Sequence, residues 1–172
     1  MRAALALALA TLLTACSQPA RNVLVADRGG FRVALPEGWE GRATDPGEWA
    51  DRRTVAIVAS QPLDPQCDAS GCTAPVASLD DGAILLWWLS ENCAGGGCEL
   101  PNGDPLLVGG RQATQVGGSH LCDALGATSE TAYIVTVTPQ RLEAIVVCGR
   151  NASDELTARA QDLLEHVGWR VP

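Results

Sequence analysis

The spacing of hydrophobic and polar residues predicts a series of short β-strands. Phe31, Val33 and Leu35 occupy alternate positions, so their side chains share one face of an extended segment. Other runs are rich in β-branched and aliphatic residues, which favour strands. The expected strands lie at residues 22–26, 31–35, 53–59, 84–89, 106–116, 132–138 and 142–148.

Turn residues join several of these strands into hairpins. Gly29 and Gly30 separate the first two strands, and glycine permits the positive φ angles that tight hairpins use. Residues 139–141 separate the last two strands and predict the clearest hairpin of the chain. Residues 106–116 contain a Gly-Gly pair and suggest a bent strand with a glycine break. We expect residues 61–80 to form an irregular insertion.

The hydrophobic period changes near the end of the chain and predicts one helix over residues 153–167. Ser153 or Asn151 is the expected N-cap, and Gly168 is the expected stop signal. One face of this helix is apolar and consists of Leu156, Ala160, Leu163, Leu164 and Val167. The predicted fold class is therefore α+β, an antiparallel sheet packed against a C-terminal amphipathic helix, with disulfide-closed loops.

The most apolar strand carries two adjacent tryptophans, Trp87 and Trp88. Neighbouring side chains of a strand point to opposite faces, so the two indoles cannot enter the same core. We expect a central strand with both faces covered. The alternatives are a helix, or an exposed aromatic surface on which Trp87 or Trp88 contacts a carbohydrate or another small ligand.

A tight turn follows the second expected strand in the segment Leu35-Pro36-Glu37-Gly38-Trp39. The pattern Phe-x-Val-x-Leu-Pro-x-Gly-Trp, together with a terminal strand and an amphipathic helix, resembles the PsbP-like fold. The resemblance covers residues 22–58 and 128–169 and implies an antiparallel sheet packed against helices. It assigns no functional residue to this chain.

The N-terminal segment is typical of an export signal. Residues 3–14 form an apolar run behind Arg2, too short for a membrane-spanning helix, which needs about 20 residues. The run ends in Leu13-Thr14-Ala15-Cys16, which resembles the lipobox of bacterial lipoproteins. The resemblance implies a signal peptide at residues 1–15 and a lipidated, palmitate-bearing Cys16.

The lipobox resemblance also implies how the rest of the chain is divided and where it is located. Residues 16–21 are expected to be a short tether, and residues 22–172 are long enough for one domain. The implied location is the cell membrane, with the domain lipid-anchored at its extracytoplasmic face.

The charge of the chain limits its partners. All twelve basic residues are arginine, and with twenty acidic residues the net charge is −8. Such a surface repels phosphate backbones and anionic headgroups, so we expect no nucleic-acid partner and no electrostatic lipid binding. Attachment to the membrane then depends on the N-terminal lipid, and the remaining partner classes are an envelope protein or a small ligand.

The six cysteines that follow Cys16 predict disulfides, because an even number of cysteines in an exported chain is typical of a disulfide set. Two pairs have four residues between the cysteines, and these spacings favour local pairing. The expected bridges are Cys67–Cys72, Cys93–Cys98 and Cys122–Cys148. The alternative for the two short spacings is a four-thiolate zinc site.

The sequence contains few candidate catalytic residues. His120 lies near Cys122 and Asp123, but no Gly-x-Ser-x-Gly motif or P-loop is present. No metal or cofactor is expected. The leading hypothesis is a non-enzymatic binding or envelope accessory domain, and the alternative is a small surface enzyme with a site near His120.

Overall fold

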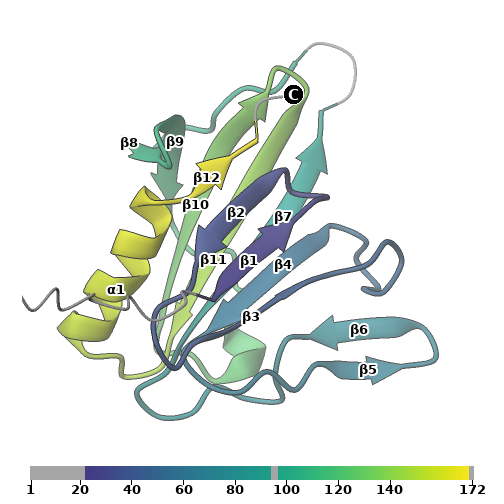
Figure 1. Ribbon diagram of the computed structural model, residues 1–172, viewed down its shortest axis with the longest axis vertical. Helices are drawn as coiled ribbons and strands as arrows, with labels where there is room; N and C mark the ends of the chain where they lie inside the picture. Colours follow the sequence, from purple (N-terminus) through teal and green to yellow (C-terminus); the bar gives the residue numbers. More distant parts are fainter. Residues whose placement is uncertain (1–21, 94–96, 171–172) are drawn as a thin grey trace, which may run out of the picture.

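The computed structural model describes residues 22–93 and 97–170 (Figure 1). Within these residues the chain forms twelve strands, one 3₁₀ turn, η1 (Asp123–Leu125), and one helix, α1 (Asp154–Glu165). The strands are β1 (Val23–Ala26), β2 (Phe31–Ala34), β3 (Glu40–Ala43), β4 (Thr54–Ala59), β5 (Gln66–Asp68), β6 (Gly71–Ala74), β7 (Ile84–Asn92), β8 (Asp104–Val108), β9 (Arg111–Val116), β10 (Ser129–Thr138), β11 (Arg141–Gly149) and β12 (Gly168–Trp169).

Seven strands form one large antiparallel sheet in the order β3-β4-β7-β11-β10-β9-β8. A small antiparallel sheet has the order β1-β2-β12, and β5 and β6 form a separate hairpin. Figure 1 shows the small sheet in front of the large one and the β5–β6 hairpin projecting to the side. The predicted α+β class, a mostly antiparallel sheet with one C-terminal helix, is confirmed.

The core consists of two apolar clusters that share strand β7. Trp88 belongs to the first cluster, with residues of the small sheet and of α1, and its ring stacks on Phe31 at 5.3 Å between centroids. Trp87 belongs to the second cluster, where its ring lies 5.6 Å from that of Trp49. The prediction of a central strand covered on both faces is therefore confirmed.

The hairpins and the helix that the sequence pattern predicted most clearly are present in the structure. Strands β10 and β11 pair over almost their full length, and β1 pairs with β2 as expected. Helix α1 begins after Ser153, whose hydroxyl accepts a hydrogen bond from the Leu156 amide at 3.2 Å. Ala160, Leu163 and Leu164 are the buried residues of this helix.

Three expectations require correction, and one strand was missed. Residues 106–116 form two antiparallel strands, because Gly109 and Gly110 both have positive φ and make a hairpin turn. Residues 61–80 contain the β5–β6 hairpin, and β3 was not expected at all. Gly168, the expected stop signal, lies two residues beyond the helix C-cap and begins the short strand β12.

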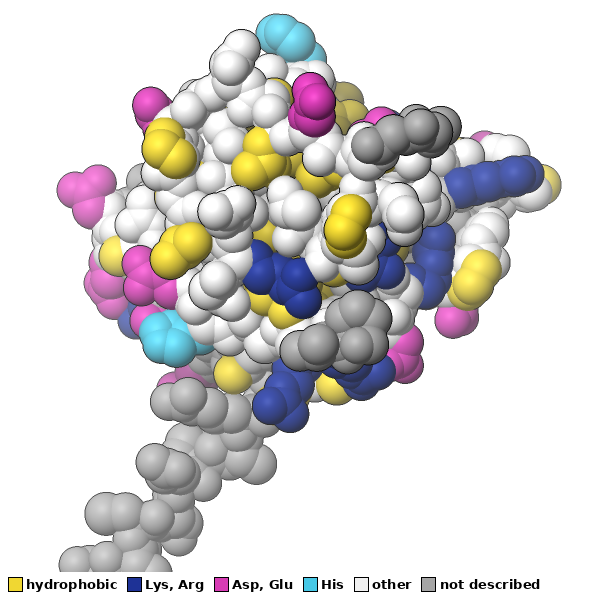
Figure 2. Space-filling view, turned by 90° about the horizontal axis from the view of Figure 1, so that it is seen from above, with side chains coloured by type: hydrophobic (Ala, Val, Ile, Leu, Met, Phe, Trp, Pro, Cys, Tyr) yellow, Lys and Arg dark blue, Asp and Glu magenta, His cyan; other side chains and the backbone are white. Residues whose placement is uncertain are grey.

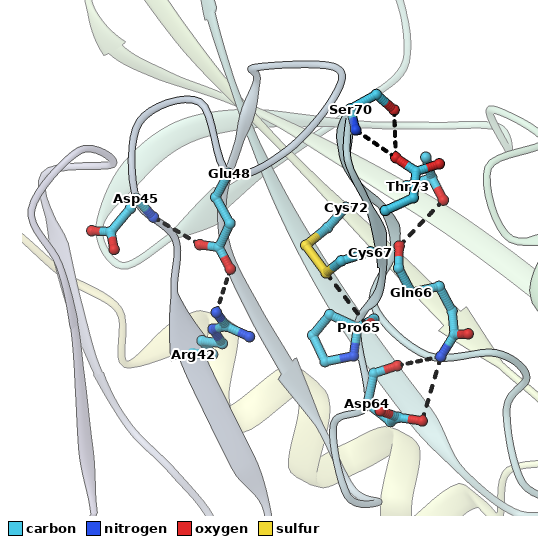
Figure 3. The surroundings of a disulfide bond; sticks show 11 residues. Arg42, Asp45, Glu48, Asp64, Pro65, Gln66, Cys67, Ser70, Cys72 and Thr73 are labelled. Atoms are coloured by element: carbon cyan, nitrogen blue, oxygen red, sulfur yellow. Dashed lines mark hydrogen bonds and ion pairs between the residues drawn. A yellow bond between two sulfur atoms is a disulfide. The ribbon is translucent and has the colours of Figure 1, made fainter.

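The six cysteines form three disulfides with the predicted pairing: Cys67–Cys72, Cys93–Cys98 and Cys122–Cys148. The sulfurs required by the zinc alternative are therefore bonded to one another. Figure 3 shows the first bridge between β5 and β6. The Cys72 amide donates to the Glu48 carbonyl at 2.8 Å, which attaches this hairpin to the loop between β3 and β4.

The turn at residues 35–39 has the expected role. The Trp39 amide donates to the Pro36 carbonyl at 3.2 Å, and Gly38 has a φ of 79°. The Trp39 side chain is then buried in the first cluster. The Pro-x-Gly spacing thus returns a large aromatic side chain to the core.

We expect Leu163→Ala to lower the free energy of unfolding by roughly 2–5 kcal/mol, because the substitution leaves a cavity among buried side chains. Chemical denaturation measures this change. Leu107→Ala is the matched control, since Leu107 is 60% exposed and its truncation should cost far less. Equal losses in the two variants would contradict the burial of the helix face.

Candidate functional site

A groove with a volume of about 620 Å³ lies between α1 and the β8–β9–β10 edge of the large sheet. Small-molecule sites in proteins typically have volumes of about 300–1,000 Å³. The groove is lined by Leu106, Leu107, Val108, Gly110, Gln115, Tyr133, Gln161, Leu164 and Glu165. It combines the end of the helix, an edge strand and one buried aromatic residue.

The β8–β9 turn is fixed against the C-terminal end of α1. The Gly109 amide donates to the Leu164 carbonyl at 3.0 Å, which satisfies one of the unpaired carbonyls at the helix end. The Trp169 indole donates to the Val108 carbonyl at 2.9 Å. A Cβ atom at position 109 would lie 2.1 Å from the Val167 carbonyl oxygen, so this close approach requires glycine.

The lining of the groove is mainly apolar. Val108 and Leu164 are buried, whereas Leu107 exposes 60% of its surface. Tyr133 is only 9% exposed, and its hydroxyl makes no hydrogen bond to any residue that the structure describes but is accessible to water in the groove. Burial raises the pKa of Tyr133, so this hydroxyl remains protonated at neutral pH. Apolar walls with one accessible hydroxyl are typical of ligand sites.

A second groove, with a volume of about 580 Å³, lies between β1 and β3. Val23 and Val25 of β1 are 54% and 41% exposed and line this groove. Its lining also contains two charged residues, Glu40 and Arg42. Strands β1 and β3 are the edge strands of their sheets, so this groove lies between two sheet edges.

Arginine is unevenly distributed over the surface. Figure 2 shows arginine side chains gathered over the middle and lower parts of the face seen from above, with several acidic side chains nearer its edge. Arg28 and Arg141 are only partly exposed, and both donate hydrogen bonds to backbone carbonyls. The lining of the groove beside α1 contains no arginine, and Glu165 is its one charged residue.

The two tryptophans considered as ligand contacts are both buried. Trp87 is 5% exposed, and its indole donates to the Thr54 hydroxyl at 2.8 Å. Trp88 is fully buried against Phe31. Neither residue lines either groove. The accessible indole that a Trp87 or Trp88 ligand contact requires is therefore missing, because both faces of β7 are covered.

His120 lies on an exposed loop outside both grooves. Its side chain is 87% exposed, and Nδ1 lies 3.1 Å from an equally accessible carboxylate, that of Asp123. The loop is held by Glu130, which accepts hydrogen bonds from the Ser119 hydroxyl at 2.6 Å and the Cys122 amide at 3.0 Å. This geometry gives His120 no enclosed substrate site and does not favour the enzyme alternative.

The residue expected to carry the lipid, Cys16, lies outside the described residues. The described part of the chain contains no helix that has the length and hydrophobicity to cross a bilayer. Over the same residues no three His, Cys, Asp or Glu side chains are grouped as metal ligands.

A buried carboxylate that the sequence interpretation missed lies on β11. Glu143 is fully buried, and neither of its carboxylate oxygens has a hydrogen-bond partner among the described residues. Its nearest charge is Arg141, with Nε 3.6 Å from Oε1, and the Arg141 guanidinium also donates to the Gly29 carbonyl at 3.0 Å. The alternation of side chains along the strand could have indicated this burial, because Glu143 and the buried Ile145 lie on the same face of β11.

Burial raises the pKa of Glu143 to about 7. The nearby Ser90 hydroxyl and the charges of Arg141 and Arg28 lower it, but they offset only part of the desolvation. Strongly shifted groups often mark functional sites, although structural ion pairs produce the same effect. Glu143 lines neither groove, which favours a structural role beneath the β1–β2 turn.

Comparison with known proteins finds no family model that matches the chain and no match among curated proteins.

We expect Glu143→Gln to remove a pH dependence of stability. The folded state holds the Glu143 proton up to about pH 7, whereas the unfolded chain releases it near 4.5. The free energy of unfolding of the native protein should therefore fall by up to about 3 kcal/mol as the pH rises through this window. Glutamine stays uncharged, so the variant should lose this decline.

Urea denaturation at several pH values between 4.5 and 8 measures the difference. Glu37→Gln is the control, because Glu37 is exposed and the substitution removes the same charge. An unchanged pH profile in Glu143→Gln would show that the buried carboxylate does not retain its proton.

Proposed function

We propose that this chain is a lipid-anchored domain at the extracytoplasmic face of the cell membrane that acts by binding, without catalysis of its own. The groove between α1 and β8 is the observation that carries the binding function. The described residues provide this concave, largely apolar site, while the one histidine considered for catalysis is on an exposed loop.

Two features support the proposed location. Leu13-Thr14-Ala15-Cys16 has the lipobox pattern behind a short apolar run. The six later cysteines form three disulfides, which persist in oxidising compartments outside the cytoplasm. The tether between Cys16 and β1 is short, so lipidation would keep the domain close to the bilayer.

We also propose that the domain has a PsbP-like fold. This assignment is supported by the Leu-Pro-x-Gly-Trp turn that buries Trp39, and by the hairpin of β10 and β11 followed by α1. Leu163 and Leu164 share an apolar cluster with Phe31 and Trp88, as expected for an amphipathic helix packed on a sheet. The β5–β6 disulfide hairpin is an addition to that arrangement.

Cys16→Ala should abolish lipidation, because it removes the thiol to which diacylglycerol would be attached. The measurement is metabolic labelling of producing cells with an alkyne-tagged palmitate, followed by capture of the chain and fractionation of membrane and soluble proteins. The unsubstituted chain should carry the label. Cys16→Ala should carry none and should leave the membrane fraction.

Ser17→Ala is the matched control, since it changes the neighbouring small side chain and keeps the thiol. It should retain the label and the membrane location. An unsubstituted chain without label would contradict the anchor. Label that persists in Cys16→Ala would assign the lipid to another residue.

A further inference from the structure

The groove beside α1 has walls suited to a hydrocarbon chain or ring. Leu106, Leu107, Val108 and Leu164 contribute its apolar surface. Leu107 is the most exposed of the large hydrophobic side chains in the described residues, at 60%. A ligand that covers Leu107 removes apolar surface from water, which favours binding by about 25 cal/mol per Å².

The polar groups of the groove are almost all uncharged. The Tyr133 side chain is nine-tenths buried, but its hydroxyl is accessible to water and has no partner among the described residues. Gln115 and Gln161 add two amides to the lining, and each amide both donates and accepts hydrogen bonds. These groups match a ligand with a hydroxyl or amide, because each of them can form a hydrogen bond with such a head.

The charge of the groove disfavours anionic ligands. Glu165 is the single acidic residue of the lining, and no arginine accompanies it. The chain as a whole has a net charge of −8. A carboxylate or phosphate entering this groove would meet repulsion without a compensating cation.

We propose that the groove between α1 and β8 binds an amphiphile without negative charge, a molecule with an apolar chain or ring and a hydroxyl or amide head. This inference rests on the proposed binding function and specifies its ligand class. The apolar body lies along Leu106, Leu107 and Leu164, and the head bonds to the Tyr133 hydroxyl. Glu165 at the helix end selects against an acidic head.

Three probes with the same eight-carbon tail test the charge preference: 1-octanoylglycerol, octanoate and octyltrimethylammonium. The protein is the full chain with Cys16→Ala, which lacks an attached lipid that would compete for the groove. Titrations followed by ¹H–¹⁵N NMR give the dissociation constant and the affected amides. We expect 1-octanoylglycerol to bind at least about tenfold more tightly than octanoate, with shifts confined to β8, β9 and the end of α1.

Two substitutions test the groove itself. Tyr133→Phe keeps the ring and removes the hydroxyl, and it should weaken 1-octanoylglycerol binding about fivefold. Leu107→Asn removes exposed apolar surface and should weaken all three probes. Val25→Asn is its matched control, because Val25 is an exposed apolar residue of the other groove and its substitution should change nothing.

A charge reversal tests selectivity. Glu165→Lys should strengthen octanoate binding relative to 1-octanoylglycerol, whereas Glu37→Lys makes the same change of net charge outside both grooves and should not. Tighter binding of octanoate to the unsubstituted groove would overturn the proposal. So would shifts that map to β1 and β3.

The result of these titrations can be distinguished from the result of the lipid-labelling experiment. Failure of all three probes, with lipid label present on Cys16, would overturn the amphiphile assignment and leave the anchored domain in place. Ultracentrifugation of the same samples tests one competing occupant. A dimer in which Leu107→Asn restores the monomer would assign this edge to a second copy of the chain and would also overturn the inference.

Discussion

Strand β7 places Trp87 and Trp88 on opposite faces of the large sheet, and burying both indoles requires a layer on each face. The rest of the fold meets this requirement in two different ways. On the Trp88 face the cover consists of regular elements, the small sheet and α1. On the Trp87 face it consists largely of loops, among them the loop that holds Trp49 and the segments around Leu79 and Leu125. Loops bury apolar surface less regularly than a sheet or helix does, so they need additional constraints.

The disulfides provide such constraints on the side that lacks regular structure. Cys72, Cys122 and Cys148 are all buried in the cluster around Trp87, and the cluster around Trp88 contains no cysteine. In the loop-entropy description the Cys122–Cys148 bridge, with a separation of 26 residues, contributes about 3.5 kcal/mol by restricting the unfolded chain. Glu130 adds hydrogen bonds to the loop next to Cys122. Although burial raises the pKa of Glu130, its hydrogen bonds with Ser119 and Cys122 leave that pKa below the usual value, so this support is present near neutral pH and weakens in acid.

The sequence predicted those parts of the fold that depend on local pattern. Alternation and turn glycines were enough for β1 and β2, two β-prone runs separated by residues 139–141 were enough for β10 and β11, and a helical period with an N-cap was enough for α1. The spacing of the cysteines favoured the pairing that the structure contains. Strand β3 was missed because Glu40-Gly-Arg-Ala43 has no apolar alternation and is defined only by its pairing with β4. The groove could not be predicted, because it depends on β8 lying at the sheet edge beside α1, and that order follows from long-range pairing.

The division between the two faces also bears on where a ligand can bind. Loops joined by disulfides hold the Trp87 face closed, whereas α1 is held to the β8–β9 turn by one hydrogen bond, from the Gly109 amide to the Leu164 carbonyl. This bond lies at the C-terminal end of the helix, where the Trp169 indole of β12 also bonds to the Val108 carbonyl. Small changes in the helix position would alter the groove width without breaking a covalent bond, because apolar packing is less directional than hydrogen bonding. The groove therefore lies on the face whose cover is held by packing and hydrogen bonds and not by disulfides.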